Sequence, residues 1–173
     1  MVIHKVLVID KKLCNGCNAC EVACEQEHML QTGPGLIKVA QKGPEEIGGK
    51  LRTEFKPSMC MHCEKPPCVS ACTLNAIRKR EDGILLIGEQ RCNGCGVCID
   101  ACPLRAIQFL SDRNLAVKCD LCVNRVDSGM LPACVEQCPT EAIKLESTRY
   151  RILIKAINGL KKSYRLPLRT ILE

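Results

Sequence analysis

The stretch that decides the fold is Cys92-Asn-Gly-Cys95-Gly-Val-Cys98-Ile-Asp-Ala-Cys102-Pro103, in which four cysteines follow the spacing C-x2-C-x2-C-x3-C. Three cysteines two residues apart let one tight loop place three thiolates around a single metal centre. Gly94 lies between the first two, and a glycine there can adopt a positive φ that brings backbone N–H groups close to bound sulfur. The fourth cysteine comes three residues later, where a short helix is expected to point it away from the loop. It therefore suits a neighbouring centre better than its own.

Cysteine runs of this kind occur four times and together contain all sixteen cysteines of the chain. The run at 14–24 repeats the spacing of 92–102. The run at 60–72 has the spacing C-x2-C-x4-C-x3-C, and the run at 119–138 has C-x2-C-x11-C-x3-C. The four groups, numbered in chain order, are Cys14, Cys17, Cys20 and Cys24; Cys60, Cys63, Cys68 and Cys72; Cys92, Cys95, Cys98 and Cys102; and Cys119, Cys122, Cys134 and Cys138. In bacterial ferredoxins the C-x2-C-x2-C-x3-C run binds [4Fe–4S] clusters and lends its fourth cysteine to the other cluster of a pair. The sequence therefore predicts four [4Fe–4S] clusters.

Structural zinc is the alternative use of such cysteines. Zinc favours two C-x2-C pairs that are separated by a spacer and give two ligands each to one tetrahedral ion. Groups one and three instead have three cysteines two residues apart, which would crowd a single zinc ion. Composition also favours large cofactors, since the chain contains no Trp, two Phe and two Tyr, too few rings to fill a core of this size.

The compartment is predicted from the N-terminal stretch and from the cysteine content. Residues 1–10 alternate like a strand and show no basic start, apolar segment, cleavage site or twin-arginine pair. No apolar run is long enough to cross a membrane. The expectation is a cytoplasmic protein without a direct membrane span, in a reducing environment that disfavours disulfides.

The spacing of the groups predicts the domain organisation and an α+β fold. Only nineteen residues separate Cys72 from Cys92, so groups two and three are assigned to an inserted inner module, 59–110. Groups one and four are assigned to an outer module, 1–58 and 111–146. Hairpins are expected at 76–87 and 106–118, each across a polar turn. The prediction is two nested bacterial-ferredoxin-like dicluster modules related by a pseudo-twofold axis.

The remaining residues, 147–173, are predicted to be a basic amphipathic helical tail, with seven Lys or Arg against one acid. Such a helix can cover its own body or dock onto a larger subunit. Because aromatic side chains are scarce among the basic ones, no nucleic-acid partner is expected.

Residues 1–146 resemble the four-cluster iron–sulfur subunits of molybdenum and tungsten oxidoreductases, a family that includes electron-transfer subunits of formate dehydrogenases, dimethyl sulfoxide reductase and nitrate reductase. Four ordered quartets of cysteine make this resemblance specific. Similar small subunits serve tungsten aldehyde oxidoreductases, carbon monoxide dehydrogenases and hydrogenases. The chain departs from the family pattern in three respects. Cys72 is followed by Thr73, where many relatives have proline. The loop within group four is short, and no membrane anchor is expected after the last cysteine.

The resemblance implies crossed ligation, in which each group lends its fourth cysteine to the neighbouring cluster. The implied sets are Cys14, Cys17, Cys20 and Cys138 for cluster 1; Cys119, Cys122, Cys134 and Cys24 for cluster 2; Cys60, Cys63, Cys68 and Cys102 for cluster 3; and Cys92, Cys95, Cys98 and Cys72 for cluster 4. It also implies two partners, a large catalytic subunit and a second electron donor or acceptor protein.

Saturated ligation predicts an electron carrier rather than an enzyme, because each iron would have its cysteine and none would be open to substrate. The favoured function is an electron-transfer subunit of a tungsten or molybdenum enzyme, such as an aldehyde oxidoreductase or formate dehydrogenase, with carbon monoxide dehydrogenase and hydrogenase as further possibilities. The alternatives are a free polyferredoxin shuttle and a zinc-bound interaction protein. His62 is interpreted as an ordinary loop residue, and His28 is assigned no role.

Overall fold

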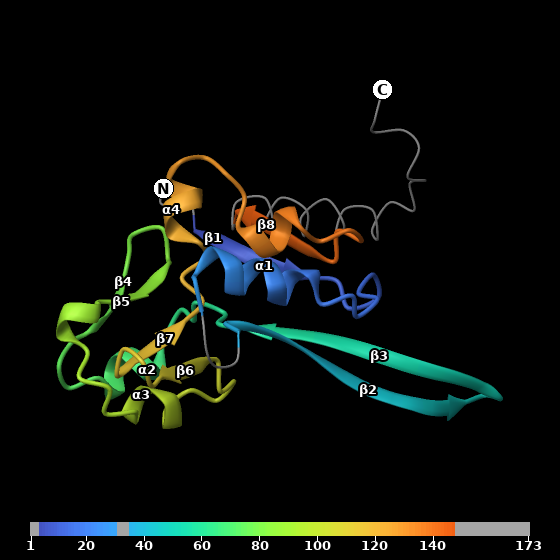
Figure 1. Ribbon diagram of the computed structural model, residues 1–173, viewed down its shortest axis with the longest axis horizontal. Coiled ribbons are helices and arrows are strands. Elements are labelled where there is room, and N and C mark those ends of the chain that lie inside the picture. Colours follow the sequence, from blue (N-terminus) through green and yellow to red (C-terminus); the bar gives the residue numbers. More distant parts are fainter. Residues whose placement is uncertain (1–3, 31–34, 148–173) are drawn as a thin grey trace, which may run out of the picture.

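The computed structural model describes residues 4–30 and 35–147 (Figure 1). The predicted tail therefore lies outside the described residues from position 148 onward. The strands are β1 Lys5–Ile9, β2 Ile37–Ile47, β3 Lys50–Met59, β4 Ile77–Lys79, β5 Leu85–Ile87, β6 Ile107–Leu110, β7 Leu115–Lys118 and β8 Ile143–Ser147. The helices are α1 Ala19–Glu27, α2 Pro67–Ala71, α3 Val97–Asp100, α4 Val123–Asp127 and α5 Ala133–Glu136, with a 3-10 turn at Glu89–Arg91.

The strands form four separate antiparallel pairs, β1–β8, β2–β3, β4–β5 and β6–β7. β1 pairs with β8 over five residues, from Lys5 opposite Ser147 to Ile9 opposite Ile143. This pair joins the N-terminal strand to the strand that follows cysteine group four. The arrangement confirms the expected N-terminal strand and the α+β class.

The two expected hairpins are confirmed. In β4–β5, Ile77 pairs with Ile87 and Lys79 with Leu85, and Gly83 closes the turn at φ +86°. In β6–β7, Ile107 pairs with Lys118, and the turn uses Asn114 at φ +53°. Glycine and asparagine tolerate this left-handed region, which a tight turn requires. The β6–β7 hairpin joins the two predicted modules, because β6 ends at the last residue of one and β7 belongs to the other.

The long hairpin β2–β3 is not predicted by the sequence pattern, which indicates only a linker rich in glycine and proline between groups one and two. It projects away from the rest of the fold, as Figure 1 shows. Its turn uses Gly48 and Gly49 at φ +62° and +74°. Most of its residues are exposed on both faces, so the alternation of apolar and polar residues that marks a half-buried strand is missing. Only its base is buried, at Ile37, Pro57 and Met59.

Cysteines take a large share of the core. One buried cluster contains Ile84, Leu121 and Ile143 together with cysteines of groups one, two and four. A second, smaller cluster contains Ile77 and Ile107 with cysteines of groups two and three. Apolar side chains thus surround the thiols instead of forming a separate aromatic core. No helix among the described residues is long and apolar enough to cross a membrane.

Candidate iron–sulfur centres

The loops of groups one and three have the same local geometry. Gly16 and Gly94 follow the first cysteine of each loop at φ +74° and +73°. The preceding asparagine accepts a hydrogen bond from the backbone N–H of the second cysteine, over 3.2 Å in both loops. The Asn-Gly pair therefore folds each C-x2-C segment into the same tight turn. A short helix follows each loop; α1 contains the fourth cysteine of group one, Cys24, as expected, whereas α3 ends at Asp100, two residues before Cys102.

The two phenylalanines of the chain lie on these two loops. A Cβ atom placed at Gly16 would overlap the ring of Phe55, and one placed at Gly94 would lie 3.1 Å from Cε2 of Phe109. Phe55 comes from the middle of β3 and Phe109 from β6. Each ring covers one side of a cysteine loop, and the side-chain-free glycine permits the close approach.

The structure brings the fourth cysteine of group two to group three. Cys72 lines one cavity together with Cys92, Cys95 and Cys98. The Cys72 Sγ atom accepts a hydrogen bond of 3.3 Å from the backbone N–H of Ala76. The fourth cysteine of group three likewise lies near group two. Burial is the main cause of the raised pKa values of Cys60 and Cys68, and the negative charge of Cys102 adds to the increase. The fourth cysteine of each group therefore lies near thiols of the other group.

Groups one and four show the same arrangement. Burial raises the pKa of Cys24 to about 12, and the next largest contribution is the charge of Cys122. Burial also raises the pKa of Cys134 to about 12, with Cys122 and Cys24 adding to the effect. For Cys20, burial and Glu21 raise the pKa to about 11, and Cys138 adds to it. Cys24 thus lies among group-four thiols, and Cys138 lies near group one.

These thiols are a donor set that fits iron–sulfur clusters. Buried, closely spaced thiols resist ionisation as free groups, whereas a metal centre replaces their protons and neutralises their charges. Cys119 is the extreme case, since full burial raises its pKa well above the usual value and Cys134, Cys24 and Cys60 add to the shift. Clusters bound at the four sites would supply one-electron redox chemistry.

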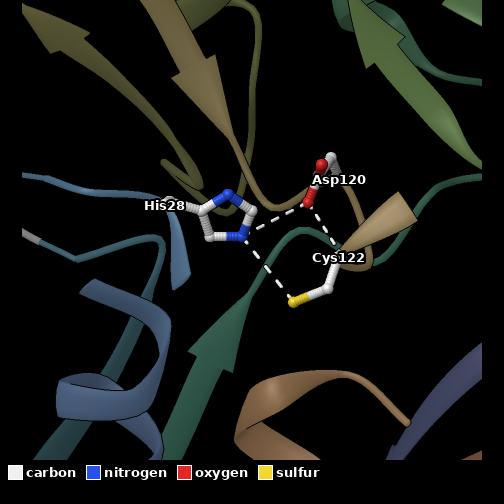
Figure 2. A group of neighbouring side chains, drawn as sticks. All are labelled: His28, Asp120 and Cys122. Atoms are coloured by element: carbon white, nitrogen blue, oxygen red, sulfur yellow. Dashed lines mark hydrogen bonds and ion pairs between the residues drawn. The ribbon is translucent and has the colours of Figure 1, made fainter. Parts of the chain in front are cut away.

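His28 and Asp120 lie next to Cys122 of group four, as Figure 2 shows. The Nε2 atom of His28 is 3.7 Å from Cys122 Sγ and 3.4 Å from Asp120 Oδ1. The same carboxylate oxygen accepts a 2.8 Å hydrogen bond from the Cys122 backbone N–H. No sequence pattern indicates this contact, because His28 is isolated in the chain and 94 residues from Cys122.

His62 is more enclosed than an ordinary loop residue. Its Nδ1 atom accepts a 2.9 Å hydrogen bond from the backbone N–H of Leu85, which ties the group-two loop to β5. Burial, with the charges of Lys118 and Lys79, lowers its pKa to about 3, so the ring is neutral and its proton is on Nε2. This N–H is buried and has no acceptor among the described residues. A buried donor without a protein acceptor fits a site that binds an anionic, sulfur-containing group.

Comparison with known proteins gives the class. Residues 51–148 match one family model described as a 4Fe–4S dicluster domain, and residues 13–76 match a second with the same description. The chain is 39% identical over 133 residues to a tetrathionate reductase subunit of Salmonella typhimurium, and the match covers 76% of the chain and 53% of the relative. It is 38% identical over 141 residues to the thiosulfate reductase electron transfer subunit of Salmonella typhi, covering 80% and 73%.

A third relative is the nitrate-inducible formate dehydrogenase iron–sulfur subunit of Escherichia coli, which is 36% identical over 152 residues that cover 79% of the chain and 52% of the relative. The chain thus spans about half the length of two of these relatives. It belongs to the family of iron–sulfur subunits of molybdenum and tungsten oxidoreductases. Its two dicluster domains imply four [4Fe–4S] clusters, and the number of cysteines, sixteen, fits four ligands for each cluster.

Proposed function

We propose that this chain is the non-catalytic electron-transfer subunit of a multi-subunit oxidoreductase, carrying single electrons between a catalytic subunit and a second redox protein. The position of Cys72, which lines a cavity with the cysteines of group three, carries the proposal. The names of the relatives, which describe iron–sulfur and electron-transfer subunits, support it.

The proposed ligand sets are the crossed ones. Cluster 1 uses Cys14, Cys17, Cys20 and Cys138; cluster 2 uses Cys119, Cys122, Cys134 and Cys24; cluster 3 uses Cys60, Cys63, Cys68 and Cys102; and cluster 4 uses Cys92, Cys95, Cys98 and Cys72. Clusters 1 and 2 belong to the proposed outer module, 1–58 and 111–146, and clusters 3 and 4 to the inner module, 59–110. The division is supported by the small buried cluster of Cys68, Ile77, Cys98 and Ile107, all from the inner module, which Ala116 of β7 joins from the outer one.

The exposure of the cysteines indicates where redox partners approach. Cys17 and Cys95 are exposed, whereas Cys60, Cys119 and Cys134 are buried. The loops of groups one and three are therefore the proposed contact surfaces for the two partners. Groups two and four lie between them, and the charge of Cys60 contributes to raising the pKa of Cys119 across the module boundary. Buried ligands shield the inner sites from water and set their redox potentials by low polarity and nearby charge.

The catalytic partner is proposed to be a tungsten or molybdenum enzyme, such as an aldehyde oxidoreductase or formate dehydrogenase. Relatives named for a formate dehydrogenase and for reductases of tetrathionate and thiosulfate support this class. The segment 147–173 is proposed to dock onto that partner, on the basis of its basic, amphipathic sequence. A cytoplasmic location remains a prediction from the sequence.

A complete metal inventory of the protein tests the proposal, after anaerobic purification from its native host with whatever co-elutes. Roughly sixteen iron atoms per chain are expected, together with molybdenum or tungsten from the catalytic partner. Nickel in place of these metals would identify a carbon monoxide dehydrogenase or nickel hydrogenase as the partner. Iron with no co-eluting metalloenzyme would favour a free polyferredoxin shuttle, and zinc without iron would contradict the proposal.

A further inference from the structure

Lys118 is the only buried charged residue among residues 4–30 and 35–147, with 5% of its surface exposed. It is the last residue of β7, directly before the first cysteine of group four. Its Nζ atom donates hydrogen bonds to the carbonyl oxygen of Leu85 and, over 3.0 Å, to that of Cys119. The ammonium is thereby fixed between β5 of the inner module and group four of the outer one.

No carboxylate among the described residues lies within ion-pair distance of Lys118, although Asp120 lines the same cavity. In the part of the chain that the structure describes, none of the ion pairs includes Lys118, and both hydrogen-bond acceptors are neutral carbonyl groups. Removing an ammonium from water is strongly unfavourable unless an anion is near. Buried charges in proteins are accordingly paired or bind metal centres. Cysteines of groups two and four, which bound clusters would hold as thiolates, are candidates for the anionic partner.

Hydrogen bonds place Lys118 between the cysteines of groups two and four. Cys119 is its neighbour in the chain and accepts its hydrogen bond through the carbonyl group. Leu85, whose carbonyl oxygen accepts the other hydrogen bond of Lys118, donates its backbone N–H to Nδ1 of His62, which lies between Cys60 and Cys63 in the group-two loop. Cys60 and Cys119 also belong to the same buried cluster. Cys60 belongs to the proposed cluster 3, and Cys119 belongs to cluster 2.

We propose that the Lys118 ammonium is the built-in counter-charge of cluster 3, and that it raises the reduction potential of this cluster above the value that the same ligands would give without it. Reduction adds an electron to an already anionic group, so a fixed cation nearby stabilises the reduced form more than the oxidised form. The same charge also acts on cluster 2, because Lys118 is next to its ligand Cys119. Lys118 acts through the field at these clusters and is therefore a positioning residue at the boundary between the modules. The inference rests on the cluster ligation proposed above.

The test compares Lys118→Met and Lys118→Gln, which remove the charge, with Lys79→Met as the matched control. Lys79 donates to the carbonyl oxygens of Cys63 and Glu64 over 3.1 and 3.0 Å, so it contacts the same loop from a more exposed position. Holoprotein prepared without oxygen is titrated potentiometrically and followed by electron paramagnetic resonance. The signal of cluster 3 is assigned by its loss in Cys63→Ser.

Both Lys118 variants are expected to shift the midpoint potential of cluster 3 to more negative values. The shift should exceed that of cluster 4 and that in Lys79→Met. If the neutral variants assemble poorly, selective loss of cluster 3, or of clusters 2 and 3, with retention of the others is the expected pattern. An unchanged potential of cluster 3, an equal shift in Lys79→Met, or loss of all four clusters together would overturn the inference. A wild-type protein that lacks iron would instead contradict the proposed function.

Discussion

Substitution of Gly94 by alanine should destabilise the group-three loop far more than the same substitution at Gly96, two residues away. Both glycines have a positive φ, +73° and +78°. A Cβ at Gly94 would lie 2.5 Å from the carbonyl oxygen of Asn114. This distance is about 0.9 Å shorter than 3.4 Å, the lower limit of an ordinary van der Waals contact. A Cβ at Gly96 would meet no atom within 4 Å. The pair therefore separates the cost of the backbone conformation from the cost of the steric clash.

The magnitudes follow from these two contributions. An alanine in the left-handed region costs about 1–2 kcal/mol, and this is the whole expected effect at Gly96. At Gly94 the backbone of the β6–β7 turn must also move, and overpacking of this kind costs a further ~1–3 kcal/mol. Because 1 kcal/mol corresponds to roughly 2–4 °C for a chain of this size, Gly94→Ala should unfold about 2–12 °C below Gly96→Ala.

The assay is thermal denaturation of the anaerobic holoprotein, followed by cluster absorbance at one fixed heating rate. The fixed rate matters because cluster loss makes unfolding irreversible. Iron content is measured for each variant before heating, and Gly94→Ala should also retain less iron at cluster 4. Equal midpoints for the two variants would refute the packing of the β6–β7 turn against the group-three loop.

Three further perturbations follow from the structure. Cys72→Ser should abolish the electron paramagnetic resonance signal of the group-three cluster and spare that of group two, and selective loss of the group-two cluster would contradict crossed ligation. Phe55→Ala should accelerate the loss of absorbance of cluster 1 in air, because the ring no longer covers the loop, and a rate equal to that of wild type would contradict this shielding role. Arg80 donates two 2.8 Å hydrogen bonds to Asp127 and so links the β4–β5 turn to α4. Asp127→Asn should therefore lower the denaturation midpoint at low salt, and high salt should remove this effect because it screens the ion pair. A decrease that is independent of salt would argue against the ion pair.

Local features of this protein could be predicted from the sequence because they depend on residues close together in the chain. The spacing of each cysteine group and its Asn-Gly pair determine the tight loops, and polar turn residues between short apolar runs determine β4–β5 and β6–β7. The number of cysteines also led to the four clusters that the family comparison supports. The hairpin β2–β3 escaped prediction because it buries only its base, so its exposed strands carry no periodic pattern.

The tertiary structure alone decided which distant residues surround each cysteine group. Spacing shows that a fourth cysteine points away from its own loop, but only packing places Cys72 in the cavity of group three. The same holds for Phe55 over Gly16 and for His28 beside Cys122. Lys118 is an ordinary residue at the end of a strand by sequence, and its importance comes from burial without a carboxylate at ion-pair distance among the described residues. Such contacts join segments far apart in the chain, so they depend on how the elements pack, which short-range spacing does not encode.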